Sequence, residues 1–84
     1  MRIEKASPGG RTTIRLIGHF RSEHIEELRK HLPQKGPGLV LDLTELMFVD
    51  VDVVRFLGAY EAGGAEVINC AAYIREWMNE ERKV

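Results

Sequence analysis

Residues 39–62 read LVLDLTELMFVDVDVVRFLGAYEA, and this stretch decides the predicted fold. Residues 39–43 are almost continuously apolar, which is typical of a strand covered on both faces. From Asp50 to Ala62 the apolar residues return at helical spacing, and two glycines follow as a C-terminal stop. The apolar arc of this segment consists of Val53, Val54, Leu57 and Tyr60. We therefore predict a central strand followed by a helix.

Two further elements are predicted after this helix. Residues 65–70 form a short strand, and residues 72–83 form an amphipathic helix with apolar and polar residues on opposite sides. The apolar side consists of Tyr73, Ile74, Trp77 and Met78. Because these residues recur at helical spacing, we expect them to face the core rather than a ligand.

The chain before residue 39 predicts a β-hairpin and one more helix. Residues 2–7 and 11–19 alternate in polarity around the turn residues Pro8-Gly9-Gly10. The expected core residues of the hairpin are Thr12, Ile14 and Leu16. Residues 22–32 then place Ile25, Leu28 and Leu32 on one narrow helical stripe. The order β-β-α-β-α-β-α predicts an α/β fold with a mixed four-stranded sheet and three helices.

Length and composition fit one small domain that spans residues 1–84. A formal net charge of −1 provides no basic field for a phosphate backbone, so we expect no nucleic-acid partner. The apolar runs are shorter than a membrane span, and the first residues lack the apolar core of a signal peptide. With a single cysteine, Cys70, the sequence predicts a cytoplasmic protein that does not insert into membranes.

The sequence contains no constellation of residues that predicts catalysis. His24 and His31 share a helix face but lie about 10 Å apart along the axis, too far to share one metal ion. Cys70 ends a predicted strand, where a lone cysteine usually behaves as a small hydrophobe. We therefore expect that the protein is not an enzyme and that it binds no metal ion and no cofactor.

The candidate site lies where residues 48–54 run into the second helix. Asp50 or Asp52 can cap the free backbone N–H groups of this helix, which is a purely structural role. With the apolar arc turned to the core, the helical period turns Asp52, Arg55, Phe56 and Ala59 outward. An exposed Phe beside a small Ala, with one acid and one base at the rim, predicts a surface for docking a protein partner.

The sequence resembles the STAS domains, the family of bacterial anti-sigma factor antagonists and of soluble domains of sulfate transporters. The resemblance rests on residues 39–44, on Met47-Phe48-Val49-Asp50, on the helix through Leu57-Gly58-Ala59-Tyr60 and on the strand that ends at Ile68-Asn69-Cys70. In this family the segment that begins at the aspartate usually reads Asp-Ser-Ser-Gly or similar, and a partner kinase phosphorylates a Ser or Thr there. Here Val51 stands at the expected phosphoacceptor position and has no hydroxyl group.

The resemblance implies a non-enzymatic interaction module of bacterial signal transduction without the usual phosphorylation switch. Its partner-binding residues would be Asp50, Val51, Asp52, Arg55, Phe56 and Ala59. The implied partner is a kinase-like anti-sigma factor or another signalling component, and a homodimer is a further option. Two alternatives stay open at this point: an accessory STAS subunit of a transporter ATPase, and a domain that binds a small ligand such as a nucleotide or a lipid.

Overall fold

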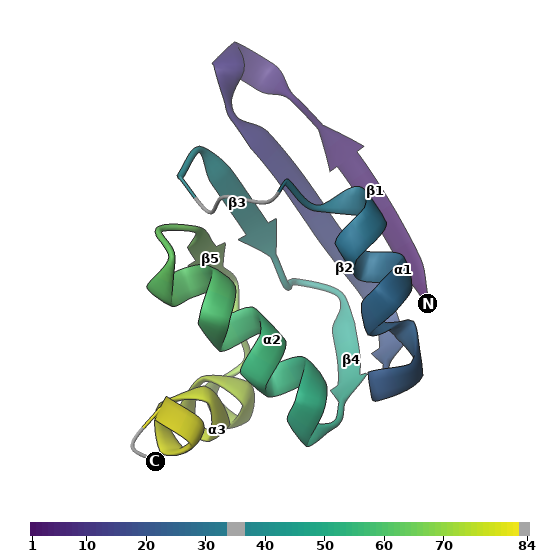
Figure 1. The fold of residues 1–84 in the computed structure, drawn as a ribbon, viewed down its shortest axis with the longest axis vertical. Coiled ribbons are helices and arrows are strands. Elements are labelled where there is room, and N and C mark those ends of the chain that lie inside the picture. The colour runs from purple at the N-terminus through teal and green to yellow at the C-terminus, as the bar shows by residue number, and fades with distance from the viewer. Residues whose placement is uncertain (34–36, 83–84) are drawn as a thin grey trace.

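A computed structural model describes residues 1–33 and 37–82 of the chain, as three α-helices and five β-strands (Figure 1). The strands are β1 (Arg2–Ala6), β2 (Thr12–Phe20), β3 (Leu39–Asp42), β4 (Leu46–Val49) and β5 (Glu66–Ile68). The helices are α1 (Ile25–His31), α2 (Val51–Ala62) and α3 (Ala72–Arg82). Short 3-10 turns occupy Pro8–Gly10 and Ser22–His24. Lys83, the last residue of the predicted third helix, lies outside the described residues.

Strand β2 is the centre of a mixed sheet. It pairs antiparallel with β1, as expected of the hairpin, and parallel with β3, which in turn pairs parallel with β5. The strand order is β1-β2-β3-β5, and β4 pairs with the second half of β2. Both β3 and β4 therefore use the same edge of β2, one after the other, as Figure 1 shows.

The prediction of four strands is wrong, because β4 forms a fifth strand that the sequence pattern did not reveal. The register of β2 shifts between Gly18 and His19, and Gly18 has a φ of 92°, which favours glycine. Its N–H donates to the carbonyl of Glu45 at 3.0 Å and holds the bend between β3 and β4. Because of this irregularity, β3 pairs with the first half of β2 and β4 pairs with its second half.

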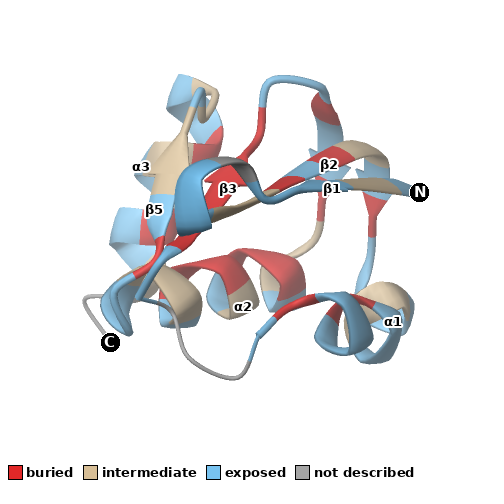
Figure 2. Ribbon diagram, turned by 90° about the horizontal axis from the view of Figure 1, so that it is seen from above, coloured by how far each residue is buried: buried red, intermediate tan, exposed pale blue. Residues whose placement is uncertain are grey.

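The core lies between the sheet and its helices, and Figure 2 shows α1 and α2 on the same side of the sheet. Ile14, Leu16 and Leu41 are fully buried there, as are Val53 and Leu57 of α2. Helix α3 packs against α2, and its Ile74 and Met78 complete the core. Most of the predicted core positions are thus confirmed.

Five predicted core positions are wrong or only partly correct. Tyr60 and Trp77 are half-buried, although both pack against the core. Thr12 and Ile25 are half-buried, since each lies at the margin of its element. Tyr73 is 54% exposed, because the first turn of α3 lies beside β4 instead of above the core, and its hydroxyl donates to the carbonyl of Met47 at 3.2 Å. Within the described residues, every helix is too short or too polar to cross a membrane.

Candidate functional site

The start of α2 is fixed by Asp50, which is the N-cap residue of the helix. Its Oδ1 accepts a hydrogen bond from the N–H of Val53 at 3.1 Å, and its Oδ2 accepts one from the N–H of Ser22 at 2.6 Å. The first bond satisfies a backbone donor that the helix itself leaves free. The second bond ties α2 to the turn before α1. Asp50 therefore has the structural role that the sequence allowed, and it connects two distant segments as well.

The Asp50 carboxylate is stabilised in its charged form. Partial burial raises the pKa of Asp50, but the hydrogen bonds from the N–H groups of Ser22 and Val53 outweigh it and hold the pKa below its ordinary value. Asp52, in the first turn of α2, is exposed. Of the two carboxylates, only Asp50 is committed to the fold, so Asp52 is the one available to a partner.

The predicted outward face of α2 is confirmed for Asp52, Arg55 and Ala59, which are exposed. Arg55 is also paired: its Nε donates to Glu81 Oε1 of α3 at 2.6 Å. Val51 is half-buried. The charged rim of this surface therefore spans two helices, which sequence spacing within α2 alone could not show.

A shallow groove of about 270 Å³ lies between α2 and α3. Its floor on α2 consists of small residues at helical spacing, namely Gly58, Ala59 and Ala62. Met78 and Glu81 line the groove from α3, and Arg55 lines it from α2. The Arg55–Glu81 ion pair therefore borders the groove, and Ala59 lies inside it rather than on a flat surface.

The prediction that Phe56 is an exposed anchor is wrong. The side chain is half-buried and packs against the core. Its ring lies 5.1 Å from the ring of Tyr60, and the guanidinium of Arg29 lies 5.5 Å above it. Helix α1 runs beside α2 and covers this flank, so the edge of the predicted surface is part of a contact between helices.

The structure adds two exposed apolar side chains on β4 that the sequence analysis missed. Met47 and Phe48 of β4 are 67% and 44% exposed, and they lie immediately before the start of α2. Phe48 packs near the ring of His19 at 5.9 Å and the guanidinium of Arg21 at 5.5 Å. The signal in the sequence was the unbroken run Leu46-Met47-Phe48-Val49, whose inner two residues are exposed, one on each face of the strand, while the outer two are buried.

The sequence analysis also missed a polar cluster, which lies at the carboxyl ends of β3 and β5. Asp42 is only 7% exposed, and its Oδ1 accepts hydrogen bonds from the backbone N–H and hydroxyl of Thr44 and from Asn69 Nδ2. Arg15 Nε lies 3.5 Å from its Oδ2. The Thr44 hydroxyl lowers the pKa of Asp42, and together with the other donors it outweighs burial, which raises it. The cluster closes the bend between β3 and β4 and is internally satisfied.

The other chemical candidates have protein partners or ordinary surroundings. His24 Nδ1 accepts from the N–H of Arg21 at 3.0 Å, and His31 Nε2 lies 3.4 Å from Glu27 Oε1. Burial raises the pKa of the Cys70 thiol, which disfavours the reactive thiolate. Among residues 1–33 and 37–82, no group of three or more His, Cys, Asp or Glu side chains could hold a metal ion.

Comparison of the chain with protein-family models and with curated proteins gave no match. The class of protein is thus defined by the fold alone: the described residues form an α/β domain with three helices and a mixed open sheet. Its best-defined surface is the start of α2 with the neighbouring strand β4.

Proposed function

We propose that this chain is a non-enzymatic protein-interaction module of the STAS type, which binds its partner through the start and outer face of α2. The supporting observation is that β4, just before a helix start that presents Asp52, exposes two large apolar side chains, Met47 and Phe48, one on each face of the strand. Large exposed apolar side chains beside charged residues are typical of docking surfaces. Asp52 and Ala59 do not contribute to the core, so they are available for binding.

The order of the elements supports the STAS-like interpretation. A hairpin is followed by helices that alternate with parallel strands, and an aspartate caps the helix after β4. In this interpretation the partner is a kinase-like anti-sigma factor or another component of a cytoplasmic bacterial signalling complex. Val51 is half-buried and has no hydroxyl, so this segment would bind without being switched by phosphorylation.

Asp52 would provide a permanent charge at the docking surface. A carboxylate carries one negative charge, against about −1.5 to −2 for a phosphate, and lacks the phosphate's three acceptor oxygens. The affinity for a partner that binds through Asp52 would therefore be lower than the affinity for a phosphorylated site. It would also be constant, whereas binding through a phosphorylated residue is regulated. The partner is expected to present a basic residue to Asp52 and apolar groups to β4, where Met47 and Phe48 are exposed on opposite faces.

The experiment that tests this function is affinity capture followed by titration of the captured partner with variants. Asp52→Arg and Ala59→Arg should each weaken binding by roughly tenfold or more, since they place positive charge and bulk on the docking surface. Glu26→Arg is a matched control, because Glu26 occupies the first turn of α1 and is exposed, as Asp52 is in α2. Equal loss in the control, or unchanged affinity in both α2 variants, would place the binding surface elsewhere.

A further inference from the structure

The outer edge of β1 is the most extended unpaired strand edge of the fold. Strand β1 ends the sheet order β1-β2-β3-β5 and pairs only with β2. Figure 1 shows it as the outermost strand, and no other element of residues 1–33 and 37–82 pairs with its free side. Because a free edge presents unpaired N–H and C=O groups, it can accept another strand.

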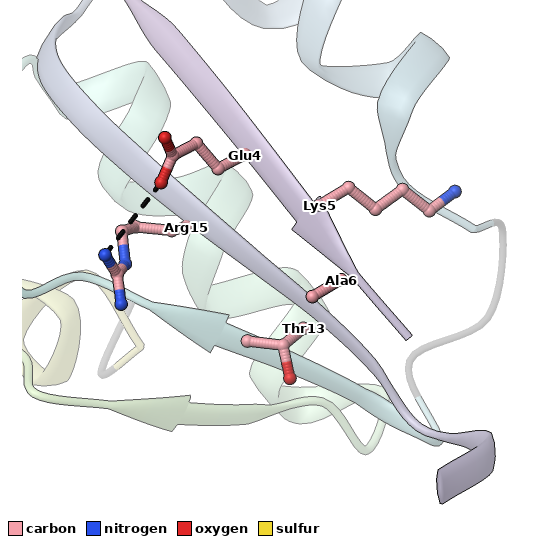
Figure 3. A pocket seen from close by; sticks show the side chains of 5 residues that line it. All are labelled: Glu4, Lys5, Ala6, Thr13 and Arg15. Atoms are coloured by element: carbon pink, nitrogen blue, oxygen red, sulfur yellow. Dashed lines mark ion pairs between the residues drawn. The ribbon is translucent and has the colours of Figure 1, made fainter. Parts of the chain in front are cut away.

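The side chains of β1 carry an ordered set of charges on the two faces of the sheet. Arg2 and Glu4 lie on one face, where Arg2 Nη2 is 3.0 Å from Glu4 Oε2. Ile3 and Lys5 lie on the other face, where Ile3 packs against the core. In Figure 3 the Lys5 side chain points away from those of Glu4 and Arg15.

Two-fold symmetry limits how a second copy can pair with this edge. In an antiparallel pair of identical strands, opposite residues share a face, so each possible register is centred on one residue facing its own copy. Centring on Arg2, Glu4 or Lys5 places like charges directly opposite, which is destabilising. Centring on Ala6 runs the second strand into the 3-10 turn at Pro8–Gly10, which is not extended.

Only the register centred on Ile3 avoids these conflicts. It places Arg2 of each copy opposite Glu4 of the other, so two pairs of opposite charge form across the junction. It also places the two Ile3 side chains opposite one another on the face that holds the helices. The order Arg2-Ile3-Glu4 is therefore self-complementary in one register and repulsive in the neighbouring ones.

We propose that the chain self-associates by antiparallel pairing of β1 with β1 of a second copy, centred on Ile3, which joins the two sheets into one. A hollow of about 520 Å³ borders this edge and is lined by Glu4, Lys5, Ala6, Thr13 and Arg15 (Figure 3). Four of these residues, Glu4, Ala6, Thr13 and Arg15, share one face of the β1–β2 pair, so the hollow lies over this face beside the edge. Five-residue strands form a small interface, so we expect dissociation constants of roughly 10 μM to 1 mM.

Sedimentation equilibrium of charge variants tests the proposal. Arg2→Glu and Glu4→Arg should each weaken self-association by roughly tenfold or more, because each places like charges opposite twice. An equimolar mixture of the two variants should associate again as a heterodimer, since opposite charges then face one another. Arg11→Glu is the control, because it reverses an exposed charge of another ion pair away from β1, at 3.7 Å from Glu66.

Cross-linking reads out the register. In a Cys70→Ser background, Ile3→Cys should form a disulfide-linked dimer on oxidation, because opposite Cβ atoms lie about 4.5–5.5 Å apart. Lys5→Cys should not, because its copy lies four residues along the strand. A wild-type chain that stays monomeric at about 1 mM, a dimer insensitive to the charge variants, or cross-linking at position 5 or at neither position would overturn the proposal.

Discussion

Replacing Asp50 by alanine removes the two hydrogen bonds that fix the start of α2. Loss of an N-cap acceptor costs about 1 kcal/mol, and loss of a charge-assisted bond to the N–H of Ser22 adds about 1 kcal/mol at this partly exposed position. We therefore expect Asp50→Ala to lower the free energy of unfolding by about 2 kcal/mol. That is a large part of the stability of a domain of this size.

Equilibrium denaturation in urea measures this change, with the fluorescence of Trp77, the single tryptophan, as the probe. The slope of free energy against urea should stay constant, because the surface exposed on unfolding does not change. Asp50→Asn should lose about half as much as Asp50→Ala, since its amide oxygen can still accept the bond from Val53. Asp52→Ala is the matched control and should cost about 0.5 kcal/mol or less, because Asp52 is exposed and interacts only weakly with the helix dipole and with Arg55.

Either of two results would contradict this role of Asp50. If Asp50→Ala costs less than about 0.5 kcal/mol, the link between α2 and the turn before α1 does not stabilise the fold. If Asp52→Ala costs as much as Asp50→Ala, the two carboxylates share the capping role, and Asp52 is not free to bind a partner.

Three further predictions use the same preparation. Ile74→Ala should lower the free energy of unfolding by about 2–5 kcal/mol because Ile74 is fully buried, whereas Tyr73→Ala should cost well under that, and equal costs would reverse the faces of α3. The pKa of Asp50 is lowered in the fold, so the stability that its carboxylate contributes is present above about pH 4 and is lost as the pH falls through the folded pKa. In denaturation curves from pH 7 to pH 2, the free energy of unfolding of Asp50→Asn should therefore fall less steeply than that of the wild type. Incubation with ATP and an anti-sigma kinase should leave residues 50–54 unmodified in phosphopeptide maps, because none carries a hydroxyl group, whereas stoichiometric phosphate on Thr44 would show that the switch has moved.

The local pattern of the chain was sufficient to predict most elements and most of the core. Helical periodicity located α2 and α3 to within a residue or two, and alternation with turn residues located the hairpin of β1 and β2. Both signals follow from the geometry of a single element, which places residues at fixed intervals along the chain on the same face. The same periodicity predicted correctly that Asp52, Arg55 and Ala59 face away from the core.

The positions that the sequence alone did not predict depend on neighbours that are distant in the chain. Strand β4 needed the bend at Gly18 in β2 before it could pair, and four residues without alternation carry no strand signal of their own. Phe56 appeared exposed on the helical period of α2, but α1 covers that flank with Arg29. Arg55 is exposed, as the helical period predicted, but its ion pair with Glu81 of α3 could not be predicted from α2 alone.

The sequence by itself determined the order of the elements other than β4, the apolar side of most of them and the absence of a hydroxyl group at position 51. Only the tertiary structure decided which polar side chains remain available, because Asp50 is held by Ser22, Asp42 by Asn69, and Arg55 by Glu81. The physical reason is one of range. Amphipathic periodicity is set by residues three or four positions apart, whereas a hydrogen bond or an ion pair at the surface depends on how whole elements pack against each other.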